Sequence, residues 1–158
     1  WQLGEKEHWR KFALWENVLQ TVLMVKVPEG VSALPEGTGG KPVCNRIVST
    51  QDIYPTLLDL CNLPARNDID GRSLVPLLAN PLTEWNYPAI SSYDFSEFSI
   101  RTEDWRYTVY IDGSEELYDH AKDPNEWYNL AAISDYQDKI KEMKQYVPKN
   151  PAPSCAAP

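Results

Sequence analysis

The feature that most constrains the fold is a short apolar run that ends at a proline. Residues Val22-Leu-Met-Val-Lys-Val27 are almost all apolar, and Pro28 follows them. Such a run is typical of a strand that is buried on both faces, as in a parallel sheet. A strand of this kind needs parallel neighbours, and no nearby stretch of the chain offers them. We therefore expect the sheet to which this strand belongs to lie outside the chain.

From Pro88 onward the pattern changes to short strands that are rich in aromatic residues. Apolar and polar side chains alternate between Trp105 and Asp112, and Asp112-Gly113 is a hairpin turn signal. Further strands are expected at 89–93, 98–102 and 116–119. The sequence therefore predicts a small antiparallel sheet of about four strands, polar on one face.

A helix near the end of the chain is predicted to cover the other face of this sheet. Ser134 is its expected N-cap, with Gln137 at the third helical position. Four apolar side chains then fall on one stripe at helical spacing. These are Tyr136, Ile140, Met143 and Val147.

Two shorter helices are expected between the apolar run and the sheet. Ser49 and Asp52 fit a capping box, and Pro55 favours a helix that begins at Asp52. Its inward face would carry Ile53, Leu57, Leu58 and Leu60. Another short helix is expected at 73–78. Asn67-Asp-Ile-Asp-Gly71 is interpreted as a tight turn, because its glycine spacing does not fit a calcium-binding EF-hand loop.

Composition excludes several classes of function. The formal net charge of −8 argues against a nucleic-acid partner. No apolar run approaches the roughly 18 residues that a membrane span needs. Cys44, Cys61 and Cys155 have no zinc-site spacing; small buried hydrophobic side chains are the favoured interpretation, and a Cys44–Cys61 pair stays open. No esterase GxSxG, Walker loop or GxGxxG occurs, so the chain by itself does not form a complete enzyme.

The first fifteen residues are dense in charged and aromatic side chains. Lys11 lies among Trp9, Phe12 and Trp15, which could shield its ammonium group from water. A lysine is suited to reach one oxygen of a sulfate or phosphate. We expect Lys11 to bind an anionic group, with a solvated charged loop as the alternative.

Several stretches, in order, resemble sulfatases. Trp1-Gln-Leu-Gly-Glu-Lys-Glu-His-Trp-Arg-Lys-Phe12 is similar to the segment that follows the metal-binding Asp-His-Gly of that family. Val48–Leu60 resembles the family's helix after a glycine-rich loop, and Asp70–Leu78 is a further family stretch. Ser99–Tyr107, Glu116–Asp119, Asp123–Glu126 and Asn129–Ala131 resemble its C-terminal subdomain. The nearest branch is the iduronate-2-sulfatase-like enzymes of polysaccharide breakdown.

The resemblance implies the C-terminal portion of an alkaline-phosphatase-like α/β enzyme. That portion would contain one or more strands of the main sheet, plus the small antiparallel sheet packed by a C-terminal helix. The expected division is 1–80 for the end of the catalytic domain, 81–148 for a small subdomain and 149–158 for a flexible tail. By resemblance, the parent protein is periplasmic, extracellular or lysosomal.

The resemblance also implies site residues. The parent would hydrolyse sulfate esters of a sulfated carbohydrate with a formylglycine beside a calcium ion. Lys11 would bind a sulfate oxygen, and Trp1 and Leu3 would line the substrate pocket. His8 is close enough in sequence to be a rim residue, but the resemblance assigns it no role. The formylglycine motif, Cys or Ser followed by x-Pro-x-Arg, does not occur, and the Asp-His pair would lie before Trp1. The remainder of the parent sulfatase is therefore the expected partner, and the chain alone is predicted to be inactive.

Two other functions stay open at this stage. One keeps the superfamily but makes the ester a phosphodiester or phosphonate monoester, which Lys11 cannot distinguish from a sulfate. The other is a non-catalytic carbohydrate-binding module that would use Trp105 or Tyr107 as a stacking surface. Core packing is the more ordinary role of these aromatic residues.

Overall fold

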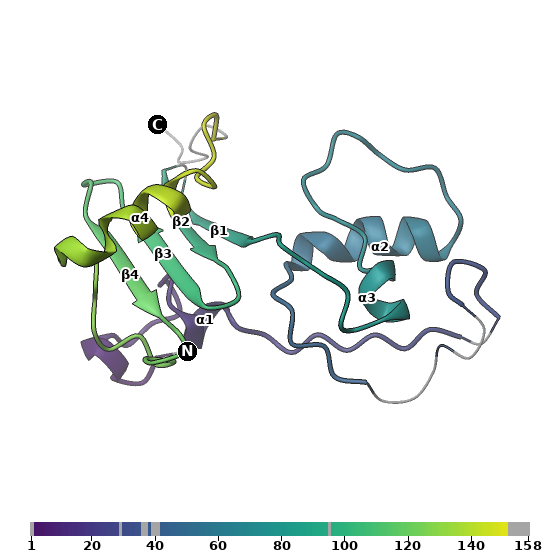
Figure 1. The fold of residues 1–158 in the computed structure, drawn as a ribbon, viewed down its shortest axis with the longest axis horizontal. Coiled ribbons are helices and arrows are strands. Elements are labelled where there is room, and N and C mark those ends of the chain that lie inside the picture. Colours follow the sequence, from purple (N-terminus) through teal and green to yellow (C-terminus); the bar gives the residue numbers. More distant parts are fainter. Residues whose placement is uncertain (1, 29, 36–37, 39–41, 95, 152–158) are drawn as a thin grey trace. The chain divides into compact units, whose positions relative to one another are not determined.

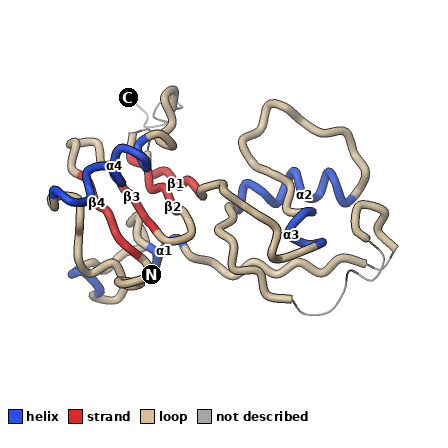
Figure 2. Tube along the Cα trace, viewed as in Figure 1, coloured by secondary structure: helices blue, strands red, loops and turns tan. Residues whose placement is uncertain are grey.

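A computed structural model describes residues 2–28, 30–35, 38, 42–94 and 96–151. The chain divides into two compact units (Figures 1 and 2). Trp1–Val22 and Pro88–Pro158 form one, here called the sheet unit, and Leu23–Tyr87 forms the other, here called the helical unit. The first 22 residues thus group with the small sheet, whereas the predicted division placed them with residues up to 80.

The sheet unit contains the predicted antiparallel sheet. Its strands are β1 (Ala89–Tyr93), β2 (Glu97–Arg101), β3 (Trp105–Val109) and β4 (Glu115–Asp119), and they lie in that order. Ile100 pairs with Tyr107, which pairs with Leu117, so three large apolar side chains line up across the centre. The predicted sheet is confirmed, and the hairpin between β3 and β4 turns at Asp112-Gly113 as expected.

The apolar face of the sheet is covered by the last helix, as predicted. A 3₁₀ turn, η3 (Ser134–Tyr136), leads into α4 (Gln137–Lys144), seen crossing the strands in Figure 1. Ile140 and Met143 are buried against Ile100, Tyr107 and Leu117. Each such side chain contributes roughly 1.5–3 kcal/mol on burial. The core residues are Phe98, Ile100, Tyr107, Leu117, Ile140 and Met143.

The predicted cap of this helix is wrong in its details. Ile133 occupies the N-cap position of η3, and no side chain caps it. The Ser134 hydroxyl instead donates to the carboxylate of Asp135. Packing of the apolar stripe therefore holds α4 in place without a capping box.

The opposite face of the sheet is polar, as expected, but it is buried. Arg106 is 2% exposed, and Ser99 and Thr108 are also buried. The N-terminal segment, residues 2–20, binds this face through contacts described below. The segment contains η1 (Glu5–Glu7) and α1 (Glu16–Leu19).

The helical unit is organised around the carboxylate of Asp52. The capping box at Ser49 is confirmed, although it caps a 3₁₀ turn, η2 (Thr50–Asp52), that precedes α2 (Ile53–Leu60). Asp52 accepts from the backbone N–H of Ser49 at 2.8 Å and of Arg72 at 2.8 Å. This ties α2 to the stretch before α3 (Val75–Ala79).

Gly71 is required for that connection. A Cβ atom at this position would lie 2.1 Å from the backbone oxygen of Gln51, closer than any real contact. In the preceding turn, Arg66 and Asp68 form an exposed ion pair. The chain bends at residues 67 and 68, and the tight turn predicted for 67–71 stays a prediction.

Two predictions for the helical unit are wrong within this chain. Ile53 and Leu57 are exposed, Leu57 by 52%, while the polar Thr56 is the buried residue of α2. Residues 22–27 form no strand, and Val22 and Met24 are 80% and 87% exposed. Both errors have one cause, because a strand needs neighbours for its hydrogen bonds and an apolar helix face needs a partner to cover it.

Cys44 and Cys61 are free and exposed, which contradicts the prediction that they are buried. Cys155 and the end of the predicted tail, 152–158, lie outside the described residues. Among the described helices, none has the length and apolar character that crossing a bilayer demands.

Candidate functional site

The segment that carries Lys11 is a closed loop. The backbone N–H of Gln2 donates to the carbonyl of Arg10 at 3.0 Å, and that of Gly4 donates to the carbonyl of His8 at 3.1 Å. Gly4 has a φ of 122°, a conformation that favours glycine. These bonds bring the two ends of the loop together, so Lys11 lies beside the start of the described chain.

The predicted site residues lie in different surroundings. Lys11 is exposed, and its Nζ lies 5.7 Å from the centroid of the Phe12 ring. Leu3 is 70% exposed, and Trp1 lies outside the described residues. His8 is half-buried and packs edge-on against Trp15, with 5.7 Å between the ring centroids.

His8 lines a small cavity of about 120 Å³. Its Nε2 atom is buried and has no hydrogen-bond partner among the described residues. The cavity walls combine aromatic rings with the carboxylate of Glu97. They are formed by His8, Phe12, Ala13, Leu14, Trp15, Tyr93, Glu97 and Tyr110.

The rings expected to surround Lys11 do not all do so. Trp9 and Phe12 are exposed, but Trp15 turns toward the sheet, where its Nε1 donates to Glu116 at 2.9 Å. Trp15 instead stacks against another lysine. The Nζ of Lys6 lies 4.5 Å from the Trp15 ring centroid and 4.3 Å from that of Tyr118.

Sequence reasoning missed Lys6. Its Nζ donates to the hydroxyl of Tyr118 at 3.1 Å. Burial lowers the pKa of Lys6, against the opposing charges of Glu116, Glu126 and Asp123. Lys6 and Tyr118 are 112 positions apart, so no local pattern could have paired them.

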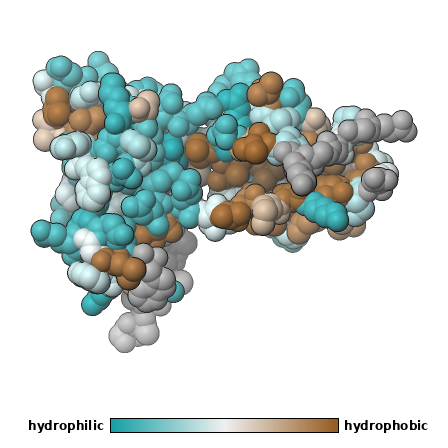
Figure 3. All heavy atoms as spheres, turned by 90° about the horizontal axis from the view of Figure 1, so that it is seen from below, coloured by the Kyte–Doolittle hydropathy of each residue, from teal (hydrophilic) through white to brown (hydrophobic). Residues whose placement is uncertain are grey.

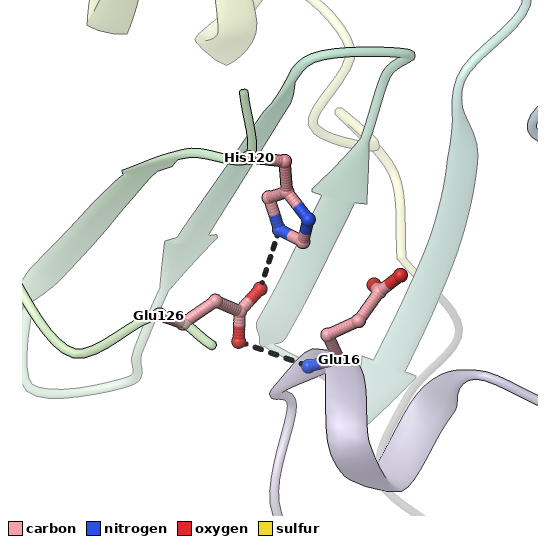
Figure 4. Close-up of side chains that lie close together, drawn as sticks. All are labelled: Glu16, His120 and Glu126. Atoms are coloured by element: carbon pink, nitrogen blue, oxygen red, sulfur yellow. Dashed lines mark hydrogen bonds and ion pairs between the residues drawn. The ribbon is translucent and has the colours of Figure 1, made fainter. Parts of the chain in front are cut away.

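A second cluster missed from the sequence lies at the buried polar face of the sheet. Glu126 is 1% exposed and accepts from Arg106 Nε at 2.6 Å and from His120 Nε2 at 2.8 Å. Its other oxygen accepts from the backbone N–H of Glu16 at 2.9 Å (Figure 4). The Glu16 carboxylate in turn forms ion pairs with Arg106 and Arg101.

The charges in this cluster balance, with two carboxylates facing two guanidinium groups. Burial would raise the pKa of Glu126, but the hydrogen bond from His120, the charge of Arg106 and the N–H of Glu16 hold it below its ordinary value. Burial lowers the pKa of Arg101, and the Glu16 carboxylate opposes this. Partners on every side make a buried charge cluster tolerable, and loss of one partner is expected to be costly.

Glu16, His120 and Glu126 have ligand atoms within 4.8 Å of one another, which raises the question of a metal site. Their oxygens, however, already accept from guanidinium and backbone N–H groups. A cation would have to displace two arginines, and calcium prefers a cage of oxygen ligands. The residues described here therefore do not fit the calcium ion that the family resemblance implies, and they act as a structural ion cluster.

An open cavity of about 440 Å³ adjoins this cluster. Glu16, Arg101 and His120 contribute to its wall together with Asp104. The backbone N–H of His120 donates to the carbonyl of Asp104 at 2.7 Å, which closes the loop beneath it. Because both acidic and basic side chains line this cavity, it has no preference for an anion.

Comparison with known proteins places the chain in a family. The family described as N-sulphoglucosamine sulphohydrolase, C-terminal, matches residues 4–151. A sulfatase from Formosa agariphila is 36% identical over 152 residues, which are 96% of this chain and 28% of that protein.

Two solved structures are similar to the chain. One, of a protein in complex with its substrate D-glucosamine-2-N,6-O-disulfate, has a TM-score of 0.53 and 32% identity over 60% of this chain and 22% of that one. The other is the phosphonate monoester hydrolase of Agrobacterium radiobacter, with a TM-score of 0.54 and 32% identity over 63% of this chain and 24% of that one.

The chain thus spans about a quarter of the length of these proteins. The family match covers the Lys11 loop from Gly4 onward, both units and α4. The expected alkaline-phosphatase-like α/β fold agrees with the two solved neighbours. The chain belongs to the sulfatase family and corresponds to the C-terminal region that the matching family describes.

Proposed function

We propose that this chain is the C-terminal segment of a sulfuric ester hydrolase that cleaves sulfate esters from a sulfated sugar. The observation that carries the proposal is the family match over residues 4–151, which includes the Lys11 loop. The similar sulfatase and the similar structure with a disulfated glucosamine support a sulfated carbohydrate as substrate. Within that class, we propose an iduronate-2-sulfatase-like enzyme, because the ordered stretches between Trp1 and Ala131 resemble that branch.

Lys11 would act by charge. Its ammonium group would donate to a sulfate oxygen and offset the negative charge that develops as the ester bond breaks. The closed loop supports this role, because the Gln2–Arg10 bond holds Lys11 beside the end where the metal-binding pair is expected to lie. Trp1, Leu3 and His8 would form the nearby pocket wall.

The remainder of the parent would supply the nucleophile and the metal. The formylglycine motif does not occur in the 158 residues, and the candidate ligands Glu16, His120 and Glu126 are already bonded to protein cations and N–H groups. Calcium, when bound, would polarise the sulfate and the formylglycine would take up the sulfuryl group. This chain's own contribution would be one cation and part of the pocket.

The test compares Lys11→Ala with Lys149→Ala in the longer natural protein. Lys149 is also an exposed lysine of the sheet unit, so it matches Lys11 in type. We expect Lys11→Ala to lower kcat/KM for an aryl sulfate by about 100-fold or more, and Lys149→Ala to leave it unchanged. Wild-type activity in Lys11→Ala would overturn the role of Lys11.

A phosphonate monoester or phosphodiester hydrolase is the second candidate. It is favoured by the similarity to the phosphonate monoester hydrolase of Agrobacterium radiobacter. Measuring kcat/KM for an aryl sulfate and for a phenyl phosphonate monoester on the same protein decides between them. A preference for the phosphonate would replace the sulfatase proposal with this one.

The carbohydrate-binding module is now disfavoured. Tyr107 is fully buried, and Trp105 packs against the core and Tyr136, with ring centroids 5.8 Å apart. Tyr107 therefore offers no face on which a sugar could stack, and half-buried Trp105 has the Nζ of Lys139 5.5 Å from its ring centroid.

A further inference from the structure

The N-terminal segment is fixed to the sheet at points on both sides of Lys11. Before it in sequence, Lys6 binds Tyr118 of β4. After it, Trp15 binds Glu116 and the Glu16 carboxylate binds Arg106 and Arg101. The backbone N–H of Glu16 also donates to Glu126, in the loop after β4. We call the residues that hold the segment through these contacts the polar seat. They are Arg101, Arg106, Glu116, Tyr118 and Glu126.

The centre of the polar seat is built from buried groups. Arg106 is held by Glu126 through Nε at 2.6 Å and donates from its NH1 nitrogen to Ser99 Oγ at 2.8 Å. Its remaining nitrogen faces the Glu16 carboxylate. The guanidinium of Arg106 therefore bonds to three parts of the unit: the sheet, the loop at Glu126 and the N-terminal segment.

Glu126 shows how strongly this arrangement is determined. It has a φ of 58°, a left-handed conformation that is uncommon for a residue other than glycine. Both of its carboxylate oxygens are nevertheless satisfied, one by Arg106 and His120 and the other by the N–H of Glu16. The left-handed conformation ends a turn in which the Glu126 N–H donates to the carbonyl of Asp123 at 3.1 Å, and the bonds to its carboxylate hold it there.

The polar seat constrains Lys11 through the backbone. The loop before Lys11 is closed by the Gln2–Arg10 bond and anchored by Lys6, and the residues after it lead directly to buried Leu14 and bonded Glu16. The backbone at Lys11 can therefore shift only if one of these anchors is released. The main hydrophobic cluster lies on the opposite face of the sheet, so on this face buried Leu14 is the apolar anchor and the polar contacts supply the others.

We propose that Glu16, Arg106 and Glu126 are positioning residues that set the place of Lys11. The inference rests on the proposed function of Lys11. These residues touch no reacting atom; they act through the segment that carries the ammonium group. A displacement of about 1 Å at a group that stabilises a transition state can lower the rate by about 100-fold.

The test is a double-mutant cycle in the longer natural protein. Glu16→Gln removes the charge that binds Arg106 and Arg101 but keeps the size of the side chain and leaves Arg106 paired with Glu126. We expect it to lower kcat for an aryl sulfate by about tenfold and to change KM little. In a Lys11→Ala background, the same substitution should lower kcat by less than about twofold. Glu16→Asp, which keeps the charge, should recover part of the loss.

The matched control is Glu142→Gln. Glu142 also pairs with a cation, Lys139, at 2.6 Å, but on the exposed face of α4. This variant should leave kcat unchanged in both backgrounds. An equal loss from Glu16→Gln with and without Lys11 would overturn the proposal, because the residue would then act independently of Lys11.

Amide hydrogen exchange separates a failure of this inference from a failure of the proposed function. In Glu16→Gln, amides of residues 2–15 should exchange faster, while those of β2 and β3 keep their protection. If Lys11→Ala leaves the activity intact, the proposed role of Lys11 fails, and the exchange pattern still decides whether the seat holds the segment. Unchanged exchange in residues 2–15 would overturn the positioning role in either case.

Discussion

The sheet unit and the helical unit differ in how much of their apolar surface they bury. Among the described residues, only Leu74 and Leu77 of the buried hydrophobic side chains belong to Leu23–Tyr87; the others lie in the sheet unit. The helical unit instead exposes large apolar side chains, and Figure 3 shows broad hydrophobic surface over it. They include Met24, Val43, Ile53, Leu57, Leu63 and Leu82.

This contrast indicates that the two units have different origins of stability. The sheet unit has a core on one face and a balanced ion cluster on the other. The helical unit is held mainly by backbone bonds to Asp52 and Thr56. Because exposed apolar patches of this kind mark interaction surfaces, we propose that the remainder of the parent sulfatase covers the helical unit. The predicted strand at 22–27 would then find its parallel neighbours there.

The largest expected effect is the loss of a charge from the polar seat. Arg106→Met leaves the buried carboxylate of Glu126 and the half-buried carboxylate of Glu16 without their shared cation, and we expect the sheet unit to lose about 3–5 kcal/mol of unfolding free energy. Arg66→Met in the helical unit breaks an exposed Arg–carboxylate pair and should cause no measurable change. Urea unfolding followed by amide exchange in each unit measures both. If Arg106→Met and Arg66→Met lowered the unfolding free energy by the same amount, the buried and the exposed ion pair would contribute equally to stability.

The next effect concerns apolar packing. Ile100→Ala opens a cavity in a fully buried core and should cost the sheet unit about 2–5 kcal/mol. Leu57→Ala removes a half-exposed side chain and should cost little in this chain, but about 2 kcal/mol or more in the longer protein if that protein covers it. The same unfolding measurement on both proteins gives the comparison. A Leu57→Ala cost that is small in both would contradict the proposed covering of the helical unit.

The same contrast explains what could be predicted from the sequence. The four strands and the stripe on α4 are encoded by residues close together in the chain, so their periodicity predicts them. The same patterns predict buried roles for Leu57 and the run at 22–27, but Leu57 and most side chains of that run are exposed in the structure. The polar seat was missed because Glu16 and Arg106 are 90 positions apart and charged residues at alternate strand positions ordinarily face water.

The smallest effect is the pH dependence of the buried ion cluster. The folded-state pKa of Glu126 lies below its ordinary value of 4.5 despite burial, because His120, Arg106 and the Glu16 N–H stabilise the carboxylate. Its contribution to stability is therefore fully present above that ordinary value and is lost as the pH falls through the lowered folded-state pKa. The stability difference between wild type and Glu126→Gln should accordingly shrink as the pH falls below about 4.5.

Asp68 of the helical unit provides the matched control, since Arg66 also lowers its pKa but both groups are exposed. In about 0.5 M salt, the pH-dependent difference for Asp68→Asn should vanish while that for Glu126→Gln persists, because screening acts on exposed charges far more than on buried ones. Salt sensitivity of the same size at both carboxylates would mean that water reaches the polar seat, and the distinction between the two units would then rest on apolar packing alone.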